Sequence, residues 1–96
     1  MNRYENGKIY KICDNGYNEC YIGSTVEALR KRMAEHRACY RSWLKGVGSN
    51  VTAYAIFEKY GVENYRIEWL EACPCSNLEE LKKREEHYIK HENVLI

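Results

Sequence analysis

The chain has 96 residues, a formal net charge of +1 and 45% hydrophobic residues. This length suits one domain with one modest core, which we expect to span residues 1–96. No apolar run is long enough to cross a bilayer, and no signal peptide precedes the first predicted strand, so we expect no membrane partner. The composition therefore indicates a soluble intracellular protein, whether cytoplasmic, nuclear or virus-encoded. A net charge this close to zero does not by itself indicate a nucleic-acid binder.

The chain contains five cysteines, an odd number. A secreted disulfide scaffold more often carries an even number placed in loops, whereas Cys13, Cys20 and Cys39 fall in predicted strands or a helix. The segment Cys73-Pro74-Cys75 lacks the usual zinc spacing and has no second pair of ligands. We therefore expect ordinary reduced thiols, favoured over a zinc site by roughly five to one.

The first predicted elements are two short strands at Lys8–Cys13 and Cys20–Thr25. The segment between them, residues 14–19, is rich in Asp, Asn and Gly, which tolerate turn conformations. Two strands joined by such a segment predict a β-hairpin.

A long helix is predicted next, ending near Leu44. Ser24 with Glu27 has the spacing of a capping box, and Thr25 is an alternative cap. Apolar residues recur at helical spacing and predict the buried stripe: Leu29, Met33, Tyr40, Trp43 and Leu44.

A second helix is expected from Val51 to Tyr60, capped by Ser49 or Asn50 and stopped by Gly61. The alternation in Tyr65–Ala72 predicts a third strand with Tyr65, Ile67 and Trp69 on one face. Ser76 and Glu79 form another capping-box spacing, for a last helix running to about Glu92. The order β-β-α-α-β-α predicts an α+β domain, in which three helices flank a small three-stranded antiparallel sheet.

Positive charge gathers in the first long helix. Between residues 30 and 45 the chain has one acidic residue, Glu35, and six basic ones: Arg30, Lys31, Arg32, Arg37, Arg41 and Lys45. Such a strip suits a surface that binds phosphates. Taken alone, however, the charge pattern favours an ordinary solvated helix face by about two to one.

Several side chains could carry chemistry. Glu85 falls on the predicted inward face of the last helix, with Leu78, Leu81, Tyr88 and Ile89. A carboxylate there is costly unless it is paired or binds a cation, and spacing leaves a structural and a functional role about even. Glu86 points elsewhere on the helix.

Arg32 and His36 are four residues apart, so they are neighbours on the helix. Alone, a histidine in an apolar stripe is more often a hydrogen-bonded core residue, by roughly two to one. Tyr10 and Tyr21 lie on the two hairpin strands, and most tyrosines in such a chain pack through their rings. A phenol needs a cation or an imidazole nearby to act as a base, and Lys8 is a weak candidate for that cation.

The order of these residues resembles the GIY-YIG nuclease family, which includes catalytic domains of homing and phage-type endonucleases. The two namesake motifs appear as Lys8-Ile9-Tyr10 and Tyr21-Ile22-Gly23, and Arg32, His36 and Glu85 follow in the family's order. Each tripeptide alone is weak evidence, but the ordered set is specific and covers nearly the whole chain.

The resemblance implies a metal-dependent endonuclease that hydrolyses phosphodiester bonds in DNA. Tyr10 would act as general base, Arg32 and Tyr21 would hold the phosphate, and His36 would support proton movement. Glu85 would bind one Mg²⁺ or Mn²⁺ ion. The expected DNA contacts are Gly23, Arg30, Lys31, Arg37 and Arg41, and Gly23 is expected to be small so that a phosphate or the helix start can approach.

The sequence departs from the family in two places. Lys8 stands where the family has glycine, and Gly7 beside it could serve instead. Family members also carry a late asparagine, for which Asn93 is the nearest candidate. Two alternatives stay open: a catalytically silent DNA-binding or protein-interaction module on the same scaffold, or a repair-type nuclease domain that acts with a partner. An appended or partner domain could also recognise the DNA.

Overall fold

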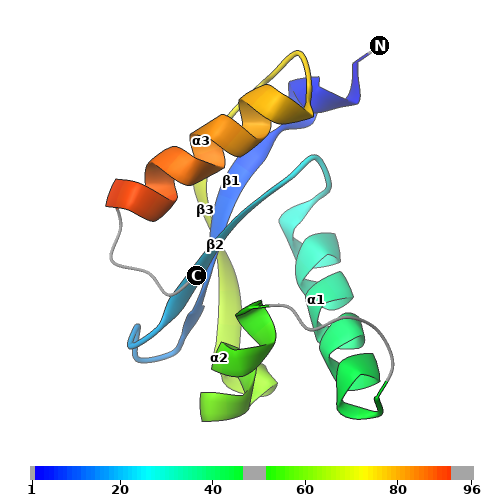
Figure 1. Cartoon of the computed structure of the whole chain (residues 1–96), viewed down its shortest axis with the longest axis vertical. Helices are drawn as coiled ribbons and strands as arrows, with labels where there is room; N and C mark the ends of the chain where they lie inside the picture. Colours follow the sequence, from blue (N-terminus) through cyan, green and yellow to red (C-terminus); the bar gives the residue numbers. More distant parts are fainter. Residues whose placement is uncertain (1, 47–51, 92–96) are drawn as a thin grey trace.

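The computed structural model describes residues 2–46 and 52–91, and its element order matches the predicted one (Figure 1). Two short 3-10 helices, η1 (Arg3–Asn6) and η2 (Val62–Asn64), are additions to the prediction. The main elements are β1 (Lys8–Asp14), β2 (Cys20–Thr25), α1 (Leu29–Leu44), α2 (Thr52–Tyr60), β3 (Tyr65–Ala72) and α3 (Leu78–His91). Within the described residues, no helix combines the length and apolarity needed to span a membrane.

The sheet is antiparallel in the order β2-β1-β3, so β1 is the central strand. Residues directly opposite one another in such a sheet share a face. Tyr10 lies opposite Gly23, and its face packs against α1; Ile9 lies opposite Ser24, and its face packs against α3. We call these the α1 face and the α3 face, and Figure 1 shows the two helices on opposite sides of the sheet.

Each face has its own apolar cluster. The cluster on the α1 face is rich in rings and joins β1, α1, α2, η2 and β3: Tyr10, Ile12, Met33, Tyr40, Tyr54, Phe57, Val62 and Tyr65. The cluster on the α3 face is smaller and is built on Ile9, Ile22, Cys75 and Leu81. The three-stranded sheet is therefore stabilised by helices on both faces, as such a small sheet requires.

Three side chains predicted to face the core are exposed instead: Trp69, Leu44 and Leu78. Leu44 ends α1 and Leu78 begins α3, where the helix leaves the surface it covers. Trp69 lies on the edge strand β3, where a register shift beside Ile9 and Tyr10 leaves Leu70 as an extra residue. The apolar cluster on the α1 face contains Tyr65, and Ile67 packs against it, but Trp69 is 56% exposed.

The predicted cap of α1 is wrong. The helix begins at Leu29, and its cap residue Ala28 has extended backbone angles and makes no side-chain hydrogen bond. Thr25 Oγ1 instead accepts from the Glu27 amide at 3.0 Å, which turns the chain before the helix. The Ser24 hydroxyl is therefore not used for capping.

The predicted cap of α3 is wrong by one residue. Asn77 Oδ1 accepts from the Glu80 amide at 3.0 Å, and the Glu80 carboxylate accepts from the Ser76 amide at the same distance. The two predicted caps of α2 lie outside the described residues. Its predicted end is confirmed, because Gly61 takes a positive φ of 85° directly after Tyr60.

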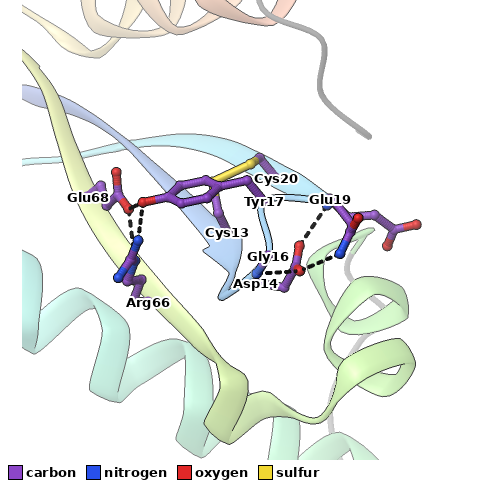
Figure 2. Close-up of a disulfide and its surroundings, with 9 residues drawn as sticks. Cys13, Asp14, Gly16, Tyr17, Glu19, Cys20, Arg66 and Glu68 are labelled. Carbon is purple, nitrogen blue, oxygen red and sulfur yellow. Dashed lines mark hydrogen bonds and ion pairs between the residues drawn. A yellow bond between two sulfur atoms is a disulfide. The ribbon is translucent and has the colours of Figure 1, made fainter.

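The expectation of reduced thiols is wrong for Cys13 and Cys20, which form a disulfide across the hairpin (Figure 2). The two residues are register partners, and their Cα atoms are 4.2 Å apart. An odd cysteine count says nothing about strand register, and register is what brings these two thiols together. Cys39, Cys73 and Cys75 are free, with the Sγ atoms of Cys73 and Cys75 3.3 Å apart.

The turn that this disulfide closes is organised by Asp14. Its carboxylate accepts hydrogen bonds from the amides of Gly16 (3.1 Å) and Glu19 (2.7 Å) and from the Asn18 side chain (3.1 Å). Burial raises the pKa of Asp14, but these hydrogen bonds outweigh it and lower that pKa below its ordinary value. Tyr17 takes a positive φ of 55° at the tip of the turn, and its ring reaches Arg66 and Glu68 on β3 (Figure 2).

Candidate active site

Tyr10 lies at the centre of the sheet, and only 1% of it is exposed. Its ring crosses the backbone of Gly23, its partner on β2, so any Cβ at position 23 would clash with the phenol. The sequence predicts that position 23 is glycine to leave space for a phosphate or for the helix start, and the structure adds a second reason. Gly23 makes room for the Tyr10 ring.

The phenol oxygen of Tyr10 joins two side chains of α1. It lies 2.9 Å from His36 Nε2, and Arg32 Nε donates to it at 3.3 Å. Because Arg32 and His36 are one helical turn apart, both reach the same atom, as their spacing predicts. The Tyr10 hydroxyl accepts from the arginine, and in the tautomer of neutral His36 that leaves Nε2 unprotonated it donates its own proton to that nitrogen.

Burial sets the protonation of this cluster. It raises the pKa of Tyr10 to about 12, although the Arg32 charge acts in the opposite direction. Burial and the same positive charge lower the pKa of His36 to about 4. Both groups are therefore neutral at pH 7. Lys8 does not assist the phenol, because its Nζ donates to the Asn6 carbonyl at 3.0 Å.

Tyr21 adds a second phenol from the edge strand β2. It lies opposite Ile12 on the α1 face, and its ring meets His36 edge-on with centroids 5.9 Å apart. Tyr21 is half-buried, and burial followed by the nearby Glu85 charge raises its pKa. The structure thus gathers Tyr10, Tyr21, Arg32 and His36, which we call the phenol cluster.

Glu85 reaches the same edge from the other face of the sheet. Its Oε1 accepts from the Ser24 hydroxyl at 2.6 Å and from Lys82 Nζ at 3.2 Å. The side chain of Glu85 is 16% exposed, whereas Glu86 is an exposed residue, as the helical pattern predicts. We call Ser24, Lys82 and Glu85 the carboxylate group. Together with the phenol cluster it surrounds the β2 edge.

The orientation of α3 is fixed by a second contact, on β3. Arg84 Nε and Nη2 bind the two carboxylate oxygens of Glu71 at 2.6 and 2.5 Å, and the Tyr88 hydroxyl donates to Glu71 Oε1 at 2.8 Å. These hydrogen bonds lower the pKa of Glu71. Arg84 and Tyr88 are one turn apart and hold one side of α3, so Glu85 is turned toward β2.

A groove lies between the two groups. Its cavity is about 320 Å³, and its walls include charged and polar side chains from η1, β2, the β2–α1 loop, α1 and α3: Arg3, Ser24, Glu27, Arg32, Glu35 and Lys82. Arg32 comes from the phenol cluster, and Ser24 and Lys82 come from the carboxylate group. A ligand in this groove would therefore touch Arg32, Ser24 and Lys82, whereas Tyr10, Tyr21, His36 and Glu85 are not part of its walls.

The expected DNA contacts on α1 differ in their surroundings. Arg30 and Arg41 are exposed, and Lys31 is exposed but pairs with Glu27 at 3.1 Å. Arg37 is half-buried, and its Nη2 donates to the Tyr65 carbonyl at 3.2 Å, which ties α1 to β3. A role for these residues in DNA binding stays a prediction. Asn93, the candidate for the family's late asparagine, lies outside the described residues.

The donor set suits a hard divalent cation held by few protein ligands. Among the described residues, no three His, Cys, Asp or Glu side chains lie close enough together to enclose a metal ion. Mg²⁺ commonly binds one or two carboxylates and takes its other ligands from water and substrate phosphates. Glu85, whose partners Ser24 and Lys82 line the groove, could be the single carboxylate of such a site. The described residues do not suit a metal that is fully enclosed by protein ligands.

Residues 6–94 match the family model for the GIY-YIG catalytic domain. The chain belongs to this family. Solved structures agree: the catalytic domain of homing endonuclease I-TevI has a TM-score of 0.66 and 26% identity, covering 91% of this chain and 88% of that one. The structure of a mutant of the I-TevI catalytic domain has the same TM-score and identity. That match covers 91% of this chain and 84% of the mutant chain. The predicted family and fold are confirmed.

Two curated relatives come from Invertebrate iridescent virus 6. The uncharacterized protein 019R is 32% identical over 84 residues, which is 88% of this chain and 28% of that protein. The putative MSV199 domain-containing protein 146R is 34% identical over 89 residues, 93% of this chain and 34% of its own length. The chain therefore spans about a third of these viral relatives.

Sequence reasoning missed the contacts that hold Glu85 in place. Ser24 was expected to cap α1, and Glu71 and Arg84 were not assigned a role. A signal for Ser24 was present, because it directly follows Gly23 on a strand that carries a namesake motif. No signal linked Glu71 to α3, since the pairing depends on how the helix crosses the sheet.

Proposed function

We propose that this GIY-YIG domain is a metal-dependent endonuclease that hydrolyses phosphodiester bonds in DNA. The observation that carries the proposal is the arrangement around the β2 edge. A hydrogen-bonded tyrosine, histidine and arginine lie on one face, and a carboxylate lies on the other; Arg32 from the first set and Ser24 and Lys82, the partners of the carboxylate, line one groove. The likeness to a homing endonuclease catalytic domain supports DNA as the substrate.

Arg32 is suited to bind the scissile phosphate. Its Nε is used by Tyr10, and its Nη1 meets Glu35 only at 3.7 Å, on a side chain that is partly open to solvent. The terminal nitrogens can therefore take two phosphate oxygens and offset the charge that develops in the transition state. Tyr21, on the neighbouring strand, would help to hold the same phosphate.

Tyr10 and His36 would move the proton of the attacking water. The water oxygen attacks phosphorus and its proton passes to Tyr10, while the phenol gives its own proton to Nε2 of His36, 2.9 Å away. The low pKa of His36 opposes this transfer, and part of that lowering comes from the Arg32 charge. A bound phosphate would neutralise that charge, so substrate binding would make His36 a better base.

Glu85 would hold one Mg²⁺ or Mn²⁺ ion at the groove. When bound, such an ion stabilises negative charge on the leaving oxygen. Ser24 and Lys82 both contact Oε1 of this carboxylate. The other carboxylate oxygen would then face the ion.

A plasmid assay tests this function. Supercoiled plasmid should be nicked or linearised with Mg²⁺ and left intact with EDTA. Glu85→Gln should abolish cleavage without unfolding the domain, because it removes charge and little volume. Glu86→Gln, its exposed neighbour, is the matched control and should cleave like the wild type. Equal cleavage by wild type and Glu85→Gln would refute the metal assignment. DNA binding without cleavage under any divalent ion would favour the silent module.

A further inference from the structure

The Ser24 hydroxyl makes the hydrogen bond that ties the Glu85 side chain to the sheet. Oγ lies 2.6 Å from Glu85 Oε1, across 61 residues of sequence. This distance is typical of a hydroxyl that donates to a charged carboxylate, which is among the stronger hydrogen bonds in proteins. The contact is partly buried, so water competes for it less than at an exposed site.

We propose that Ser24 is a positioning residue that orients the Glu85 carboxylate toward its cation. The proposal rests on the metal role of Glu85 in the proposed function. A carboxylate can bind a metal through one oxygen while its other oxygen accepts a hydrogen bond, and such a partner orients the ligand without competing for the ion. In the described part of the chain, Ser24 and Lys82 both use Oε1, and no hydrogen bond reaches Oε2.

Ser24 is well placed for this role because its backbone is part of the sheet. It pairs with Ile9 on the central strand, so the hydroxyl starts from a rigid position. Lys82, the other partner of Oε1, is different. It belongs to α3 itself and its side chain is 55% exposed, so it cannot fix the carboxylate relative to the sheet.

The remaining freedom of Glu85 lies in its side chain. The contacts of Arg84 and Tyr88 with Glu71 hold the helix on its other side. They leave the torsions of the Glu85 side chain undetermined. Without the Ser24 hydroxyl, the carboxylate could turn toward Lys82 and solvent, and each ion would have to reorder it on binding.

Metal affinity measured without turnover tests the proposal. We would titrate the full chain with Mn²⁺ and follow free Mn²⁺ by electron paramagnetic resonance, for wild type, Ser24→Ala, Ser24→Thr and Glu85→Gln. Loss of an orienting partner typically weakens metal binding by about 10- to 100-fold, and we expect this range for Ser24→Ala. Ser24→Thr keeps a hydroxyl and should stay within about threefold of wild type. Thermal melts check that each variant is folded.

The variants separate this inference from the proposed function. If Glu85→Gln binds Mn²⁺ as tightly as wild type, the metal assignment fails, and this inference fails with it. If Glu85→Gln loses binding while folded Ser24→Ala keeps wild-type affinity, the metal assignment survives and the role of Ser24 is refuted. An equal loss in folded Ser24→Ala and Ser24→Thr would also refute it, because the hydroxyl would not be the cause.

Discussion

The phenol cluster and the carboxylate group are held by different forces. Tyr10 and His36 are almost fully buried and pack among the rings of the main core, with His36 edge-on to Phe57 at 6.4 Å between centroids. Glu85 is held by polar contacts to Ser24 and Lys82 at the rim of the sheet. The geometry of the phenol cluster is therefore a product of folding, whereas that of the carboxylate group can be changed without unfolding the domain. Variants of the two groups should differ accordingly.

Within the phenol cluster, the largest effect is expected at Arg32, which lines the groove. Arg32→Ala should lower kcat by roughly 10²- to 10³-fold and change the Kd for DNA little, because the guanidinium acts on transition-state charge. Single-turnover cleavage and fluorescence anisotropy measure the two quantities. Arg41→Ala, an exposed residue on the same helix, is the control and should weaken binding without a large change in kcat. If both variants lose only affinity, Arg32 is an ordinary phosphate contact.

His36 should make the stability of the domain depend on pH. Its pKa is about 4 in the folded chain against an ordinary 6.5, so the unfolded state binds more protons between these values. Stability should therefore fall as pH falls from about 6.5 to about 4, by on the order of 3 kcal/mol. Urea unfolding of wild type and His36→Gln across this range measures it. An identical pH slope in both proteins would show that His36 is not the source.

Gly23 should be the next most sensitive position. Gly23→Ala places a methyl group against the Tyr10 phenol, and overpacking of this kind costs about 1–3 kcal/mol. We expect a lower melting temperature together with loss of cleavage. Gly16→Ala is the matched control, because a Cβ there meets only the movable side-chain ends of Asn18 and Asp14 in an exposed turn, and no buried ring. A Gly23→Ala protein as stable as the Gly16→Ala protein would contradict the tight packing of the phenol cluster.

The smallest effects should be those of the exposed basic residues on DNA affinity. With a net charge of +1, the isolated domain can neutralise few phosphates, so we expect a Kd near the nonspecific range of about 10⁻⁴ to 10⁻⁶ M. Unrelated duplexes should bind alike in an anisotropy titration, and selection of a target would come from another domain or partner. Binding to one duplex tighter by several orders of magnitude would show that this domain carries its own recognition surface.

More of the geometry of the phenol cluster than of the carboxylate group could be predicted from the sequence. Arg32 and His36 converge because helical spacing places them on one side of α1, and the hairpin places Tyr10 beside the strand that carries Tyr21. Helical periodicity also distinguished Glu85 from Glu86. The sequence could not predict contacts that depend on how α3 crosses the sheet. Those of Glu85 with Ser24 and of Arg84 with Glu71 are examples.

Local signals failed where tertiary contacts competed with them. Ser24 and Glu27 have the spacing of a capping box, yet the Ser24 hydroxyl binds a carboxylate from a distant helix. The disulfide was missed because a cysteine count carries no register, and Cys13 and Cys20 meet only once the hairpin is paired. In both cases the decisive partner is set by the fold and not by the neighbouring residues.

One diffraction measurement tests most directly whether the two groups act on one phosphate. A Tyr10→Phe variant, which lacks the phenol hydroxyl, would be crystallised with a DNA duplex and Mn²⁺, and the ion located by its anomalous signal. We predict one Mn²⁺ in contact with Glu85 and with an oxygen of the same phosphate that Arg32 binds. Mn²⁺ bound elsewhere, with Glu85 still held by Ser24 and Lys82 alone, would contradict the account.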